Sequence, residues 1–156
     1  MSQYGSGIHV RAATFEDLPA IRRLLADDVL GSQRERLDAA TTARYEAAFH
    51  AILSQEGNQI LLGVRHAEIV AMLQLTFIPG LSHQGATRAQ IESVGVKSGV
   101  RGQGIGKIML HEAIDVSRQA GCSIVQLTTD QGRPDAVRFY ESLGFEPTHV
   151  GMKLRI

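Results

Sequence analysis

The sequence contains almost no cysteine. Cys122 is the single cysteine among 156 residues, so the chain can form no internal disulfide and no zinc site that needs several thiolates. This composition fits a reducing compartment, and we expect a cytoplasmic protein. The six histidines lack metal-site spacing, such as two histidines four positions apart on one helix, so we assign no metal.

Excess charge and long apolar segments are also lacking. Lysine plus arginine number 16, as do aspartate plus glutamate, which gives a formal net charge of zero. Nothing in this balance attracts nucleic acid or an anionic membrane surface. No apolar stretch approaches membrane-spanning length, and the polar residues 1–7 lack the pattern of a signal peptide. We therefore expect a small molecule or a limited protein surface as partner, with no nucleic acid and no membrane.

The length fits one domain with its own core, and we expect a single domain over residues 1–156 in which residues 1–6 are disordered. Apolar patterns predict strands at residues 8–12, 60–64, 69–78, 90–96 and 124–127, with a final strand or strands over 145–154. Helices are predicted from about 18 to 28, through 45–52, from about 104 to 121, and between 134 and 144. Thr14 and Asp17 have the spacing of a capping box before the first helix. This order predicts an α/β fold of the α+β type, with a mixed, mostly antiparallel central sheet flanked by helices.

A glycine-rich turn lies between the strand that ends near residue 96 and the helix that begins near residue 104. Its residues are Arg101, Gly102, Gln103, Gly104, Ile105 and Gly106, followed by Lys107. Glycines let backbone N–H groups approach an anion without obstruction by a Cβ atom. A helix N-terminus attracts phosphate oxygens through its unpaired N–H groups and its dipole, and Arg101 can add a charge-assisted contact. The turn therefore predicts a phosphate-binding site.

Two other phosphate-binding motifs do not fit the spacing of this turn. A P-loop needs a glycine where Arg101 stands and a hydroxyl residue where Ile108 stands. A dinucleotide-binding fingerprint needs its third glycine where Lys107 or Met109 stands. A flexible loop that merely leads into a helix is the remaining structural interpretation.

The turn resembles the signature of the GNAT superfamily of acyl-CoA N-acyltransferases, which reads Arg or Gln, two residues, Gly, one residue, then Gly or Ala. The signature is matched by Arg101, Gly104 and Gly106. The resemblance extends to a second family segment, Ala-x-x-Phe-Tyr-x-x-x-Gly-Phe, which is matched by Ala136, Phe139, Tyr140, Gly144 and Phe145. It implies a GNAT-like fold, with acetyl-CoA as the co-substrate bound at the turn.

The resemblance also implies roles for individual residues. Tyr140 stands where the family has its general acid, which protonates the departing CoA thiolate, and Glu92 resembles the acidic residue that takes the amine proton. Backbone groups of Val94 and Val96 would bind the pantetheine arm and polarise the acetyl carbonyl. Arg133 stands where the family often has an asparagine, and we expect it to contact a CoA phosphate.

Simpler interpretations of these residues remain open. Glu92 can be a solvated or ion-paired strand residue, and Tyr140 can be a core aromatic. Gly95 fits a β-bulge, the close approach of a ligand, or a glycine packed beneath a helix. Cys122 has no activating neighbours in the sequence, so we expect a structural thiol rather than an acetyl-accepting nucleophile.

The implied activity is direct transfer of an acetyl group from acetyl-CoA to a primary amine of a small molecule or peptide. A base is useful because an alkyl amine is mostly protonated near neutral pH. The alternative is a non-catalytic acyl-CoA-binding regulatory module of the same fold. The acceptor would be recognised by residues 31–44 and 79–88, whose mixed charge selects no substrate. Exposed sheet edges would permit a homodimer.

Overall fold

The computed structural model describes residues 7–27 and 29–156, so the disorder predicted for residues 1–6 lies outside the described chain. In chain order the elements are β1 (His9–Ala12), η1 (Phe15–Asp17), α1 (Leu18–Ala26), α2 (Val29–Arg34), α3 (Ala39–Ser54), β2 (Asn58–Arg65), β3 (Glu68–Pro79), α4 (Ser82–Gly85), β4 (Thr87–Val96), η2 (Ser98–Val100), α5 (Ile105–Gln119), β5 (Ile124–Leu127) and α6 (Pro134–Glu141). Elements η1 and η2 are short 3₁₀ turns.

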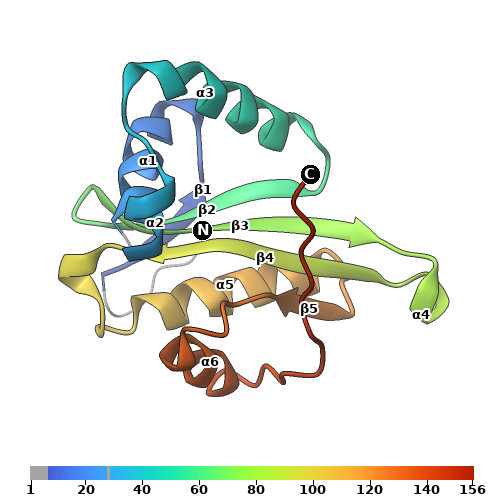
Figure 1. The fold of residues 1–156 in the computed structure, drawn as a ribbon. Coiled ribbons are helices and arrows are strands. Elements are labelled where there is room, and N and C mark those ends of the chain that lie inside the picture. The colour runs from blue at the N-terminus through green and yellow to red at the C-terminus, as the bar shows by residue number, and fades with distance from the viewer. Residues whose placement is uncertain (1–6, 28) are drawn as a thin grey trace.

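The strands form one sheet in the order β1-β2-β3-β4-β5. The pairs from β1 to β4 are antiparallel, and β4 pairs with β5 in parallel. Helices α1 and α3 lie on one side of the sheet, and α5 and α6 lie on the other (Figure 1). This arrangement confirms the predicted mixed, mostly antiparallel sheet with flanking helices. Within the described ranges, no helix is both long enough and apolar enough to cross a membrane.

Each face of the sheet has its own hydrophobic core. Successive strand residues point to opposite faces, so Leu61 packs in the core beneath α5 while Leu62 packs in the core beneath α1 and α3. Helix α5 approaches β2 closely at Gly63, where a Cβ atom would lie 2.9 Å from the Met109 sulfur. The absence of a side chain at Gly63 therefore lets α5 lie flat on the sheet and fixes the position of its N-terminus.

The capping box predicted at the start of the first helix is present. The Thr14 N–H donates to Asp17 Oδ2 at 2.8 Å, and the Arg11 guanidinium donates to both carboxylate oxygens at 2.7 and 2.8 Å. The hydrogen bonds from Arg11 favour the ionised carboxylate, which lowers the pKa of Asp17 from 3.8 to about 2. These contacts fix the entry into α1, whose far end reaches the candidate site.

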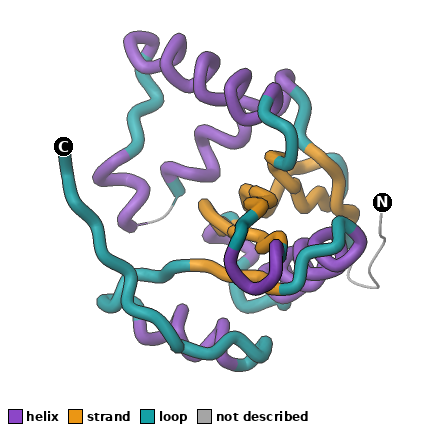
Figure 2. The backbone as a smooth tube through the Cα atoms, turned by 90° about the vertical axis from the view of Figure 1, so that its right-hand side faces the viewer, coloured by secondary structure: helices purple, strands orange, loops and turns teal. Residues whose placement is uncertain are grey.

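Two parts of the chain differ from the sequence-based expectation. Helix α2 was not predicted, because residues 31–40 are mostly polar and carry no clear helical period. The final strand predicted over residues 145–154 was wrong, since the described structure has no strand after β5. Alternating apolar residues are there, but a strand forms only when its backbone finds a partner, and this segment leads away from the sheet (Figure 2).

Candidate active site

The parallel pairing of β4 with β5 ends in the middle of β4. Paired residues run from Arg88 opposite Ile124 to Ile91 opposite Leu127, after which β5 stops and β4 continues to Val96. Glu92 is the first β4 residue beyond the last pair, and its side chain is exposed. Within residues 7–27 and 29–156, the second half of β4 thus has no strand partner on the β5 side. This free edge of β4 leads directly into the glycine-rich turn.

A β-bulge lies at the start of this free edge. Glu92 is opposite Gln74 and Gly95 is opposite Met72, so two β4 residues face the single β3 residue between them. The first of the two, Ser93, has φ of 53°, a left-handed conformation that is uncommon for a residue other than glycine. The bulge adds twist to β4 at the point where it leaves β5.

The bulge does not lie at Gly95, one of the interpretations left open by the sequence. A Cβ atom at Gly95 would lie 3.7 Å from Met72 Cγ and 3.9 Å from Leu24 Cγ, which are ordinary van der Waals distances. Gly95 therefore packs beneath α1, in agreement with the simplest of the three interpretations. The bulge, which was one of three interpretations of Gly95, lies at Ser93, for which the sequence carries no comparable signal.

The glycine-rich turn has the backbone expected of an anion-binding loop. Gly102 and Gly104 have φ of 76° and 78°, and Gly104 is the residue that precedes α5. A Cβ atom on either glycine would meet nothing within 4 Å, so the space above the turn is open. The first backbone N–H groups of α5, from Ile105 to Lys107, have no partner within the helix and point to this space. Lys107 is exposed beside them.

Arg101 is turned back toward the protein rather than forward into this space. Its Nε donates to the Val96 carbonyl at 2.9 Å, and its Nη2 donates to the Asp27 carbonyl at 3.1 Å. The Asp27 carboxylate in turn accepts from the Ser98 N–H at 2.5 Å and from the Ser98 hydroxyl at 3.1 Å. The turn is thus fastened to the end of β4 and to the C-terminal end of α1. These two bonds use the Nε and Nη2 groups of the guanidinium, and its Nη1 group takes no part in them.

Gly106 has a packing role. A Cβ atom there would lie 3.3 Å from Phe139 Cζ, so the missing side chain makes room for the α6 ring against the first turn of α5. This contact joins the two segments matched in the sequence, because Phe139 adjoins Tyr140. The second glycine of the signature therefore positions α6 relative to the turn.

Sequence reasoning missed one residue at this turn. Arg65, the last residue of β2, donates to Gln103 Oε1 at 2.7 Å. The contact brings a guanidinium to the open side of the turn, beside the N-terminus of α5. Residues 65 and 103 are far apart in the sequence, and neither belongs to a local motif that predicts their contact.

Tyr140 lies on α6 among other aromatic rings. Its ring centre is 5.3 Å from that of Phe139 and 6.0 Å from that of Phe145. Burial raises the pKa of the Tyr140 hydroxyl above its usual 10.0, and the positive charge of Arg133 opposes part of this rise. The hydroxyl forms no hydrogen bond with any residue of the described chain. Tyr140 is therefore a protonated phenol at neutral pH with a free donor.

The remaining expected residues can also be placed. Glu92 forms no ion pair with any described group, so of its two simpler interpretations the solvated one fits. Arg133 is the N-cap residue of α6, and its positive charge acts on Tyr140. Burial raises the pKa of the Cys122 thiol, which disfavours the nucleophilic thiolate. Residues 7–27 and 29–156 contain no group of three or more potential metal ligands.

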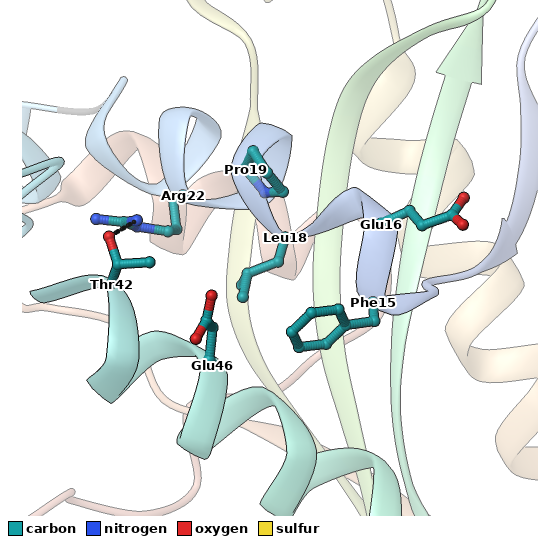
Figure 3. Close-up of a pocket in the computed structure, with 7 residues that line it drawn as sticks. All are labelled: Phe15, Glu16, Leu18, Pro19, Arg22, Thr42 and Glu46. Carbon is teal, nitrogen blue, oxygen red and sulfur yellow. Dashed lines mark hydrogen bonds between the residues drawn. The ribbon is translucent and has the colours of Figure 1, made fainter. Parts of the chain in front are cut away.

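A separate cavity of about 210 Å³ opens between the start of α1 and α3 (Figure 3). It is lined by Phe15, Glu16, Leu18, Pro19, Arg22, Thr42 and Glu46. The Arg22 guanidinium donates to Thr42 Oγ1 at 2.9 Å and stacks 4.6 Å from the centre of the Tyr45 ring. None of the residues expected from the sequence to take part in catalysis lines this cavity, and its arginine serves to hold α1 against α3.

The chain has a strand that leaves its neighbour, an open glycine-rich turn at a helix N-terminus and a half-buried tyrosine, all of which match the family resemblance. Direct comparison shows that the chain belongs to the acetyltransferase (GNAT) family. The family profile matches residues 18–145. Aminoalkylphosphonate N-acetyltransferase of Salmonella typhimurium is 30% identical over 140 residues, which cover 90% of this chain and 86% of that protein.

Two further proteins are similar to this chain, one in sequence and one in structure. Glucosamine 6-phosphate N-acetyltransferase of Trypanosoma brucei brucei is 33% identical over 86 residues, or 55% of this chain and 56% of that protein. A solved structure described as a transcriptional regulator from Bacillus halodurans C-125 is 45% identical, with a TM-score of 0.92 over 96% of this chain and 99% of its own.

Proposed function

We propose that the protein transfers an acetyl group from acetyl-CoA to a primary amine of a small molecule or peptide. The observation that carries the proposal is the release of β4 from β5 immediately before the glycine-rich turn. A free strand edge can hydrogen-bond an extended arm that contains amides, and the turn can bind the diphosphate at the end of that arm. Acetyl-CoA has both of these parts.

The diphosphate would bind the backbone N–H groups at the start of α5, at the turn formed by Gly102, Gln103, Gly104, Ile105 and Gly106. Lys107 and Arg65 would supply positive charge from either side of the turn, while Arg101 would position it. The pantetheine arm would run along the free edge of β4 and bond to the backbone of Val94 and Val96. Arg133, whose charge also acts on Tyr140, would contact a CoA phosphate.

The reaction would begin with removal of a proton from the protonated amine. Glu92, at the start of the free edge, would accept that proton directly or through a water. The neutral amine would attack the thioester carbonyl, and backbone N–H groups of β4 would stabilise the negative charge on its oxygen. Collapse of this intermediate would break the C–S bond, form the amide and release CoA thiolate. Tyr140 would donate its proton to that thiolate, because its burial keeps the hydroxyl protonated at neutral pH. The second proton of the attacking nitrogen would then pass to the Tyr140 phenolate, which leaves a neutral amide and restores the phenol.

The relatives narrow the search for the acceptor. The Salmonella relative is named for an aminoalkylphosphonate and the Trypanosoma relative for glucosamine 6-phosphate. Both acceptors are small primary amines that carry a phosphorus oxyanion. We propose a small amine of this kind as the first class to test, with peptide amines second.

The alternative is an acyl-CoA-binding regulatory module, which the description of the Bacillus halodurans relative as a transcriptional regulator favours. The two proposals differ in turnover. Calorimetry with acetyl-CoA measures binding, and release of the CoA thiol across a panel of amines measures transfer. Binding without thiol release for any amine would support the regulatory module. Failure to bind acetyl-CoA would contradict both.

The assignment of the acid has a matched control. Tyr140→Phe keeps the ring between Phe139 and Phe145, so it should leave folding intact and lower kcat by about 10²- to 10⁴-fold. Tyr45→Phe removes a hydroxyl that bonds to Glu35 on the far side of the sheet and should leave kcat unchanged. A Tyr140→Phe variant as active as Tyr45→Phe would exclude Tyr140 as the acid.

A further inference from the structure

The cavity between the start of α1 and α3 contains a carboxylate without a partner. Glu46 lies on α3, is half-buried, and forms no hydrogen bond or ion pair with any described residue. Figure 3 shows its carboxylate pointing toward the side chain of Leu18 and the ring of Phe15. Glu16, the other acidic residue of the lining, points away from them. The Glu46 carboxylate therefore loses part of its hydration to apolar neighbours and gains no compensating contact.

The positive charge of the same lining is already engaged. The Arg22 guanidinium lies over the Tyr45 ring, and its Nη1 donates to Thr42 Oγ1 at 2.9 Å. Its Nη2 donates to the carbonyls of Arg36 at 3.1 Å and Asp38 at 3.2 Å. The Nε has no hydrogen-bond partner, but this atom is buried and closed to a ligand. The open part of the cavity therefore favours a cation over an anion.

The rest of the lining sets the size and character of a ligand. Three apolar residues, Phe15, Leu18 and Pro19, line the cavity from η1 and the first turn of α1. Phe15 is 42% exposed, and its ring stacks on that of His50 with 4.6 Å between the ring centres. A cavity of about 150 Å³ can hold benzene, so this cavity of about 210 Å³ suits a molecule of about seven non-hydrogen atoms. An organic ammonium ion with a short apolar chain has both the charge and the size.

We propose that the cavity binds a small organic ammonium ion. Its N–H groups donate to the Glu46 carboxylate, and its apolar part contacts Leu18 and Pro19. The ligand offsets the unpaired charge of Glu46 and fills the space between α1 and α3. This site is separate from the free edge of β4, and binding there involves no covalent step.

Helix α1 connects the cavity with the glycine-rich turn. The cavity residues lie at its start, and Asp27 lies at its other end, about 13 Å away along nine helical residues. Asp27 accepts hydrogen bonds from Ser98 and Arg101, which fasten the turn. A ligand between α1 and α3 holds α1 in place and with it the turn, so ammonium binding should strengthen the binding of acetyl-CoA. This second part rests on the proposed binding of acetyl-CoA at the turn.

A tertiary amine tests the site apart from acetyl transfer. N,N-dimethylbutylamine has about seven non-hydrogen atoms, is protonated at pH 7 and forms no stable amide, because its nitrogen carries three carbon substituents. Titration of the labelled protein without acetyl-CoA, followed by NMR, should give saturable shifts of the Leu18 and Glu46 amides with Kd on the order of 1 mM. The neutral analogue N,N-dimethylbutanamide should bind about tenfold more weakly or less.

Two matched variants test the role of the charge. Glu46→Gln should weaken binding of the amine about tenfold and leave binding of the neutral amide unchanged, since it removes only the charge. Glu16→Gln removes the carboxylate that points away from the cavity, and it should change the Kd of the amine by less than about twofold. Absence of saturable shifts at the cavity in the wild-type chain, or equal losses in the two variants, would overturn the proposal.

Calorimetry with acetyl-CoA tests the connection through α1. At a saturating concentration of the amine, the Kd of acetyl-CoA should fall about fivefold for the wild-type chain and stay unchanged for Glu46→Gln. An amine that binds at the cavity without changing the Kd of acetyl-CoA would overturn the connection. A chain that binds the amine but no acetyl-CoA would contradict the proposed function and support the site.

Discussion

Substitution of Asp17 by asparagine tests how the start of α1 is held. Asp17 accepts hydrogen bonds from Arg11 and Thr14, and its side chain is only 11% exposed. Its pKa of about 2, compared with 3.8, corresponds to on the order of 2 kcal/mol of stabilisation. Arg11 is 30% exposed, so solvent reduces this value and we expect Asp17→Asn to lower the free energy of unfolding by about 1–2 kcal/mol at pH 7.

The loss should depend on pH in a defined direction. The pKa of Asp17 is lower in the folded than in the unfolded chain, so its contribution is fully present above about pH 5 and declines as pH falls through 3.8 toward 2. Urea unfolding followed by circular dichroism at pH 7 should therefore separate Asp17→Asn from wild type, and the difference should shrink near pH 3. At pH 7 the midpoint of thermal unfolding should drop by about 3–6 °C.

Glu16 provides the control for this experiment. It is the adjacent acidic residue, it is exposed, and its side chain forms no hydrogen bond or ion pair with any described residue. Glu16→Gln removes the same formal charge and should change the unfolding free energy by less than about 0.5 kcal/mol. If both variants lose equal stability, or if the Asp17→Asn loss persists unchanged at pH 3, the pairing with Arg11 does not stabilise the fold as argued.

Three further predictions concern the glycine-rich turn. Gly104→Ala places a side chain at φ of 78°, at a cost of about 1–2 kcal/mol, and should weaken acetyl-CoA binding about tenfold by calorimetry. Gly99 also lies in open space but has an ordinary φ, so Gly99→Ala should leave acetyl-CoA binding unchanged. Gly106→Ala would bring a Cβ atom to 3.3 Å from Phe139 and should lower stability by about 1 kcal/mol in urea unfolding. Arg65→Ala should raise KM for acetyl-CoA about two- to fivefold with kcat unchanged, and an unchanged KM would remove Arg65 from the site.

Local signals predicted most of the fold. The β2–β3 hairpin, the short strand β5 and the limits of α5 each follow from apolar period and turn residues within about fifteen positions. The same is true of the capping box and of the glycines at the turn, because positive φ is a property of one residue at a time. These features could therefore be predicted from the local sequence alone.

Features that depend on distant contacts were not predictable in this way. The bulge at Ser93 results from the register of β4 against β3, and the Arg65 contact with Gln103 results from where the hairpin comes to lie. A final strand or strands were predicted over residues 145–154, yet pairing needs a partner edge that a pattern cannot locate. In each case the missing information is the position of another segment.

The position of Arg101 explains the form of the sequence signature itself. The signature accepts Arg or Gln there, and these side chains share N–H donors but not a charge. A phosphate ligand would favour Arg strongly, whereas a donor to backbone carbonyls can be either residue. Arg101 donates to the carbonyls of Val96 and Asp27, which is the use that both side chains allow. Arg101 thus joins β4 to α1 in the structure, and this connection holds the first N–H groups of α5 toward the open space above the turn.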